Sequence, residues 1–120
     1  MPSLPAPNTS GVYQIRCIPT GKIYVGSAVS LRDRWYRHRK SLSGGTHKNR
    51  YLQSAWDKYG EQSFELEILE YVDVSHLLLA EQEWIDSTSC TDRTIGFNLY
   101  NIAGSPGQSL AQTWEGFIDP

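Results

Sequence analysis

The sequence predicts a mixed α/β (α+β) fold in which helices pack on a small central sheet. Three short segments show the two-residue period of β-strands, and three others repeat apolar residues with the period of an α-helix. Their order along the chain is β-β-α-α-β-α. A length of 120 residues with 39% hydrophobic residues suits one compact domain.

A β-hairpin is predicted at the start of the fold. Its strands are expected at residues 11–17 and 23–26, where β-forming residues recur and the first run alternates apolar with polar side chains. Pro19, Thr20 and Gly21 lie between the two runs and are typical of a tight turn. Gly21 can adopt the positive φ that such a turn often requires.

Two helices are predicted next, separated by a Gly-rich loop. Ser30 is expected to cap the first helix, with Asp33 three residues later, and this helix is expected to end near Leu42. The second helix is expected to start from Asn49 and to end at Gly60. Its predicted apolar stripe consists of Tyr51, Leu52, Ala55, Trp56 and Tyr59.

A third strand and a third helix complete the predicted fold. Residues 63–71 alternate apolar and largely acidic positions, as in a half-buried strand. Ser75 is expected to cap the last helix, which is expected to run to about Ser87. Its predicted apolar face consists of Leu77, Leu78, Ala80, Trp84 and Ile85.

Glu81 lies at the centre of that apolar face. A carboxylate in such a position needs a cation or hydrogen-bond donors, because burial of an unpaired charge is costly. A metal ligand is one interpretation. The alternatives are a structural salt bridge or a place at the edge of the helix that reaches water.

Basic residues are concentrated in the first half of the chain. Residues 1–60 contain ten Lys and Arg against Asp33 and Asp57, whereas residues 61–120 contain Arg93 alone against eleven acidic residues. A surface that binds a polyanion would therefore come mainly from the first half, unless the fold interleaves the two halves and cancels the field. In the first predicted helix, Arg34 and His38 lie along one flank of the apolar stripe.

Several classes of protein do not fit the composition. No apolar run approaches the roughly 18 residues that a membrane span requires, and the proline-containing start lacks the features of a secretory signal. Cys17 and Cys90 lie far apart, without the spacing of a zinc site or a disulfide framework. A soluble, cytosolic protein without membrane contacts is expected.

Several short motifs resemble those of the GIY-YIG nuclease superfamily. Gly11-Val12-Tyr13 and Tyr24-Val25-Gly26 are similar to the two tripeptides that name it. The resemblance covers about residues 11–103 and is closest to the catalytic domains of phage-type intron-homing endonucleases. Further matches, in the order of the family, are Gly26-Ser27-Ala28, Arg34-Trp35, His38, His47, Trp56, Tyr59-Gly60, Glu81, Trp84-Ile85 and Gly96-Phe97-Asn98.

The resemblance implies a mainly antiparallel sheet and metal-dependent hydrolysis of DNA phosphodiester bonds. Glu81 would hold one Mg²⁺ or Mn²⁺ ion, which prefers oxygen ligands. Arg34 would bind the phosphoryl oxygens through its planar fork. Tyr13 would act as the general base, with His38 taking or relaying its proton, and Tyr24 would orient water or phosphate. The opposite assignment of the two tyrosines stays open.

Substrate contacts, domain boundaries and rival functions complete the expectations. Residues 1–10 are interpreted as a Pro-rich leader, residues 11–103 as the nuclease domain, and residues 104–120 as a linker and the start of a DNA-binding region in a longer parent. DNA is the expected partner, and no small-molecule cofactor is expected.

Three other functions are alternatives to a homing endonuclease. They are a structure-specific DNA repair nuclease of the same superfamily, a metal-free tyrosine recombinase and a non-catalytic nucleic-acid-binding module. Substrate contacts are expected from Gly26, Arg37, His47, Lys48 and Asn98. His47 could instead assist proton transfer, and the amide of Asn98, or alternatively of Asn101, could position the metal-binding helix or the edge of the active site.

Overall fold

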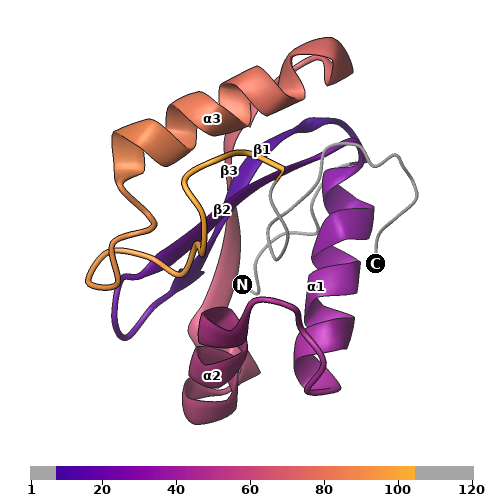
Figure 1. Cartoon of the computed structure of the whole chain (residues 1–120). Coiled ribbons are helices and arrows are strands. Elements are labelled where there is room, and N and C mark those ends of the chain that lie inside the picture. Colours follow the sequence, from indigo (N-terminus) through magenta and orange to yellow (C-terminus); the bar gives the residue numbers. More distant parts are fainter. Residues whose placement is uncertain (1–7, 105–120) are drawn as a thin grey trace.

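A computed structural model describes residues 8–104 and confirms the predicted order of elements (Figure 1). Short 3-10 turns, η1 (Glu61–Ser63) and η2 (Val74–His76), precede the third strand and the third helix. The main elements are β1 (Gly11–Cys17), β2 (Ile23–Ala28), α1 (Leu31–Ser43), α2 (Arg50–Tyr59), β3 (Phe64–Tyr71) and α3 (Leu77–Thr88).

The sheet has the strand order β2-β1-β3, and both pairings are antiparallel. Tyr13 lies opposite Gly26 and Ile15 lies opposite Tyr24 in the register of β1 and β2. Side chains of a strand alternate between faces, so this register places Tyr13 and Tyr24 diagonally on the same face. An isolated parallel bridge between Ile23 and Gly96 adds a short segment to the outer edge of β2.

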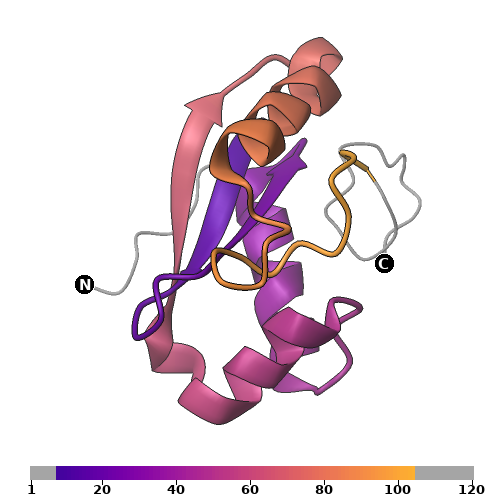
Figure 2. The same ribbon diagram turned by 60° about the vertical axis from the view of Figure 1, so that its left-hand side comes forward.

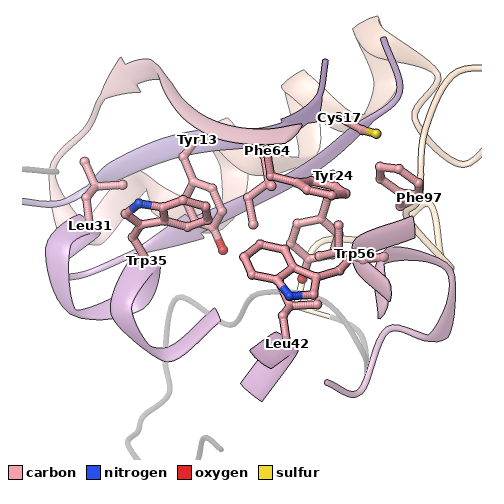
Figure 3. Packing of buried hydrophobic residues seen from close by; sticks show 12 residues of the cluster. Tyr13, Cys17, Tyr24, Leu31, Trp35, Leu42, Trp56, Phe64 and Phe97 are labelled. Atoms are coloured by element: carbon pink, nitrogen blue, oxygen red, sulfur yellow. The ribbon is translucent and has the colours of Figure 1, made fainter. Parts of the chain in front are cut away.

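Each face of the sheet has its own buried cluster. The first cluster joins Tyr13 and Tyr24 to apolar residues of α1 and α2, and Figure 3 shows both rings pointing from the strands into this layer. The second cluster joins Val12 and Val25 to residues of α3. The sheet therefore separates the α1 and α2 layer from α3, and Figures 1 and 2 show α3 well apart from the other two helices.

Local signals at the turns and helix ends are confirmed. Gly21 in the hairpin turn and Gly60 after α2 have φ values of 75° and 89°. The Ser30 hydroxyl accepts a hydrogen bond from the Asp33 backbone at the start of α1. The Asn49 side chain accepts from two backbone N–H groups at the start of α2. These short-range interactions define where both helices begin.

Three details of the sequence prediction were wrong. Ser75 does not cap α3, because its hydroxyl donates to Asp73 instead and η2 precedes the helix. Leu78 is exposed on α3 and not part of its buried face. Tyr51 is also exposed, with its ring 4.8 Å from the guanidinium of Arg50 and 4.3 Å from that of Arg93.

Both cysteines are buried free thiols, as expected from their spacing. Among the helices of residues 8–104, none has the length and apolar character needed to cross a bilayer. Most of the predicted leader (residues 1–7) and nearly all of the predicted linker and its downstream aromatic residues (105–120) lie outside the described residues.

Candidate active site

Three elements bring the predicted catalytic residues together around the edge strand β2. The hairpin contributes Tyr13 and Tyr24, α1 contributes Arg34 and His38, and α3 contributes Glu81. The hairpin also depends on close backbone packing at Gly11, where a Cβ atom would lie 2.6 Å from the backbone oxygen of Glu70. A glycine at this position therefore lets β1 pack closely against β3, two residues before Tyr13.

His38 links the two tyrosines to α1. Its Nε2 lies 2.6 Å from the Tyr13 hydroxyl oxygen. The rings of Tyr13 and Tyr24 both meet the imidazole edge to face, with centroid distances of 5.6 and 5.5 Å. Burial, followed by the charges of His47 and Arg34, holds the pKa of His38 well below its usual value. His38 is therefore a neutral imidazole beside a buried phenol.

A second histidine continues this hydrogen-bonded chain. His47 Nε2 lies 2.8 Å from His38 Nδ1, and the Asn49 backbone N–H donates to His47 Nδ1 at 3.0 Å. The backbone N–H of His47 is held in turn by the Gln53 side chain. Burial lowers the pKa of His47 to about 4. His47, predicted as a substrate contact or a residue that assists proton transfer, is thus joined to His38.

Glu81 is fully buried, as its helical position predicts. Its Oε1 accepts a 2.5 Å hydrogen bond from the Ser27 hydroxyl. Its Oε2 makes no hydrogen bond of normal geometry within residues 8–104. Burial raises the pKa of Glu81 to about 8, against smaller opposing effects of the Ser27 hydroxyl, the Arg34 charge and the nearby Gly104 backbone.

Arg34 connects the two halves of the site electrostatically. It is half-buried on α1. Its positive charge lowers the pKa values of both His38 and Glu81. Tyr13 and Glu81 belong to layers on opposite faces of the sheet, and the Arg34 charge acts on a group in each layer.

Asn98 supports the outer edge of β2. Its Oδ1 accepts from the Val25 N–H at 2.8 Å and its Nδ2 donates to the Val25 carbonyl at 2.9 Å. The preceding residue, Phe97, donates its backbone N–H to the Ile23 carbonyl, and its own carbonyl accepts from the Asn49 side chain. These bonds favour a positioning role for Asn98 over a direct contact with substrate, whereas the alternative residue, Asn101, is exposed.

The other predicted substrate residues lie around the buried group. Gly26 is buried opposite Tyr13. Arg37 and Lys48 are exposed on α1 and on the loop before α2. Within residues 8–104, no cluster of three or more His, Cys, Asp or Glu residues is arranged to hold a metal ion. Any cation at this site would therefore depend on Glu81 together with water and substrate oxygens.

Sequence reasoning assigned no role to two residues of the site. Ser27 shares a face of β2 with Val25, so its hydroxyl enters the α3 layer and reaches Glu81. A polar residue at this alternate strand position, directly after the Tyr-Val-Gly motif, is the signal that could have identified it. Gln53 binds the His47 backbone from α2, but no spacing in the sequence indicates this contact.

The three-stranded α+β fold and the paired motifs of its hairpin are typical of a nuclease-type catalytic domain. The model of the GIY-YIG catalytic domain matches residues 9–95, so the chain belongs to the GIY-YIG family. It is 40% identical over 96 residues to Intron-associated endonuclease 1 of Enterobacteria phage T4. That alignment covers 78% of this chain but only 37% of the phage protein.

Solved structures show the same fold. The catalytic domain of homing endonuclease I-TevI matches with a TM-score of 0.69 and 34% identity, over 77% of this chain and 99% of that chain. A mutant of the same catalytic domain matches equally well, over 94% of its own chain. The mixed α/β architecture and its antiparallel sheet are therefore those of the GIY-YIG catalytic domain.

Proposed function

We propose that this chain is the catalytic domain of a DNA endonuclease that hydrolyses phosphodiester bonds with one divalent cation. The observation that supports this most strongly is that the Arg34 charge acts both on His38, which bonds Tyr13, and on the buried Glu81. The endonuclease relative of phage T4 agrees with this chemistry. A homing type of enzyme is the form of activity that we favour.

Glu81 is the residue proposed to hold the cation, Mg²⁺ or Mn²⁺. Its Oε2 is a buried oxygen that makes no hydrogen bond of normal geometry within residues 8–104, and a cation would satisfy such an atom. Hard cations accept a single carboxylate because they keep several water ligands and share substrate phosphate oxygens. When bound, such a cation supplies positive charge to the phosphate and its leaving oxygen.

The remaining residues have roles in binding and proton transfer. The Arg34 guanidinium is proposed to hold the phosphoryl oxygens while negative charge builds up on them. Tyr13 is proposed as the base toward the attacking water, and Tyr24 as the group that orients water or phosphate. Both phenols are buried on the same face of the sheet, so they approach the substrate from the same layer.

Cleavage of supercoiled plasmid tests the proposal. The chain should convert the plasmid to nicked or linear DNA with Mg²⁺ and should stop when EDTA is added. Glu81→Gln should be inactive, whereas Glu83→Gln, on an exposed position of the same helix, should cleave normally. Continued cleavage in EDTA with covalent attachment to tyrosine would indicate a recombinase.

Two further outcomes separate the other rival functions. Binding of DNA without any cleavage would indicate a non-catalytic module. Cleavage of branched or damaged duplexes in strong preference to intact plasmid would indicate a repair nuclease of the same family. Each outcome contradicts a different part of the proposal.

A further inference from the structure

The hydrogen-bonded chain behind Tyr13 has a direction that a backbone group determines. It runs from Tyr13 through His38 to His47 and ends at the Asn49 N–H. We propose that His38 is a fixed hydrogen-bond donor to the Tyr13 oxygen and does not accept the Tyr13 proton, and that His47 is the residue that positions it in this role. The catalytic meaning of this arrangement rests on the proposed function.

The direction follows from one donor that cannot change. A backbone N–H can only donate, so His47 Nδ1, 3.0 Å from the Asn49 nitrogen, must accept and carries no proton. The ring proton of His47 is then on Nε2, which donates to His38 Nδ1 at 2.8 Å. With Nδ1 occupied as an acceptor, neutral His38 carries its proton on Nε2 and donates it to Tyr13 at 2.6 Å.

The geometry of the two imidazoles fits an in-plane N–H···N bond. Their rings are within 19° of parallel, and their centroids are 5.0 Å apart. The centroid separation exceeds the 2.8 Å between His38 Nδ1 and His47 Nε2 by about the width of one ring. The rings are therefore nearly coplanar and meet edge to edge. Both the N–H bond and the lone pair of an imidazole lie in its plane, so this arrangement aligns the donor with the acceptor.

The surroundings keep both rings neutral. His38 is faced by Arg34 on its own helix, His47 on the loop before α2, Tyr13 on β1 and Tyr24 on β2. None of these groups is an anion that would favour an imidazolium. The pKa values of His38 and His47 are both lowered, chiefly by burial. One proton per ring is therefore the state at neutral pH, as the direction of the chain requires.

The loop that carries His47 is built to hold this orientation. The Gln53 side chain accepts from the His47 backbone N–H and donates to the carbonyl of Leu42, at the end of α1. Asn49 caps α2 with its side chain, and its backbone N–H donates to His47 Nδ1. The start of α2 thus fixes the tautomer of His47, which acts on Tyr13 through His38.

The donor role changes the expected path of the protons. Tyr13 would transfer its own proton to a water molecule that enters with the substrate and not to His38, and the resulting phenolate would be stabilised by the His38 N–H, since a hydrogen bond to the charged form favours that form. In the cleavage step the attacking water gives its proton to the Tyr13 oxygen while His38 keeps its own. For His38, this donor role replaces the proton-accepting role that the family resemblance implied.

Nuclear magnetic resonance of the full chain tests the direction without any cleavage. Long-range correlation spectra of ¹⁵N-histidine protein at neutral pH should place one hydrogen on Nε2 of both His38 and His47. A scalar coupling across the hydrogen bond should join His47 Nε2 to His38 Nδ1, with the hydrogen bonded to His47. Spectra of the His76→Gln variant identify the signals of the third histidine. A hydrogen on His38 Nδ1, or an imidazolium at His38, would overturn the proposal.

Two variants of His47 link the tautomer to catalysis. His47→Gln keeps an amide N–H that can donate to His38, whereas His47→Leu removes the donor. The single-turnover cleavage rate should rise with pH as Tyr13 ionises. In the leucine variant the pH at half-maximal rate should be about one unit higher than in wild type, because a stabilising hydrogen bond to the phenolate is weakened. The glutamine variant should restore the midpoint. Equal midpoints in wild type and the leucine variant would contradict the positioning role. A chain that does not cleave DNA at all would defeat the proposed function but would leave the spectroscopic test intact.

Discussion

Glu81 on α3 accepts a 2.5 Å hydrogen bond from Ser27 on β2, and both residues are fully buried. The pair lies within the apolar layer between the sheet and α3. The Ser27 hydroxyl thus orients one oxygen of the Glu81 carboxyl group, and the other oxygen is the atom proposed to hold a cation. Burial of this carboxyl group should carry a cost to stability, in addition to the role in cation binding proposed for Glu81.

The cost should be visible as a pH-dependent stability of the metal-free protein. Burial raises the folded-state pKa of Glu81 from 4.5 to about 8. Its contribution to the free energy of unfolding is therefore fully present below pH 4.5 and is lost as the pH rises to about 8, roughly 1.4 kcal/mol per pKa unit. Urea unfolding across this range should show Glu81→Gln losing less stability than wild type. Mg²⁺ should selectively stabilise wild type at alkaline pH; identical pH profiles of the two proteins would contradict the burial of a titrating carboxyl.

Arg34→Lys should lower the cleavage rate sharply while leaving the fold intact. Lysine keeps the charge but lacks the planar fork that can hold two phosphoryl oxygens. We expect a decrease of at least tenfold in single-turnover rate, with a circular dichroism spectrum like that of wild type. Arg32→Lys is the matched control, because Arg32 is exposed on the same helix. Equal rates for both variants would show that Arg34 is only a structural charge.

Asn98→Ala should destabilise the protein by about 2 to 4 kcal/mol, since two buried backbone groups of Val25 lose their partner. The exposed Asn101 provides the control, and Asn101→Ala should change stability by no more than about 0.5 kcal/mol. Chemical denaturation gives the free energy of unfolding of both variants and tests this difference. A small effect at Asn98 would mean that the edge of β2 does not depend on this side chain.

Local features of this fold could be predicted from the sequence because they depend on neighbouring residues. Gly21, Ser30 and Gly60 act within a turn or at a helix end, and all three have the predicted conformation, contact or position. The burial of Glu81 also followed from the pattern of its own helix.

Contacts between distant segments could not be predicted in the same way. The bond from Ser27 to Glu81 joins residues 54 positions apart and depends on which face of the sheet α3 covers. The link from His38 to His47 depends on a loop conformation that has no periodicity. Ser75 was misassigned because Asp73, two residues away, competes for its hydroxyl. The family motifs identified the residues of the site but not the bonds between them.

DNA binding by this chain should be weak, dependent on salt and almost independent of sequence. Ten of the eleven Lys and Arg residues lie in the first half of a chain whose net charge is −2. Arg37→Ala and Lys48→Ala should each reduce the slope of log affinity against log salt by about one, if each side chain contacts a phosphate. Fluorescence anisotropy over a salt series measures this. Unchanged slopes in both variants, or nanomolar sequence-selective binding, would contradict the predicted phosphate contacts.

Single-turnover cleavage of plasmid DNA by Tyr13→Phe and Tyr24→Phe tests the central claim most directly. Both substitutions keep the buried ring and remove only the hydroxyl, so circular dichroism and unfolding should change little. Loss of an acid–base group typically lowers a rate by about 10² to 10⁴, and we expect a decrease in this range, larger for Tyr13, whose oxygen bonds His38. Rates near wild type for both variants, in the same Mg²⁺ buffer, would show that neither phenol takes part in the chemistry.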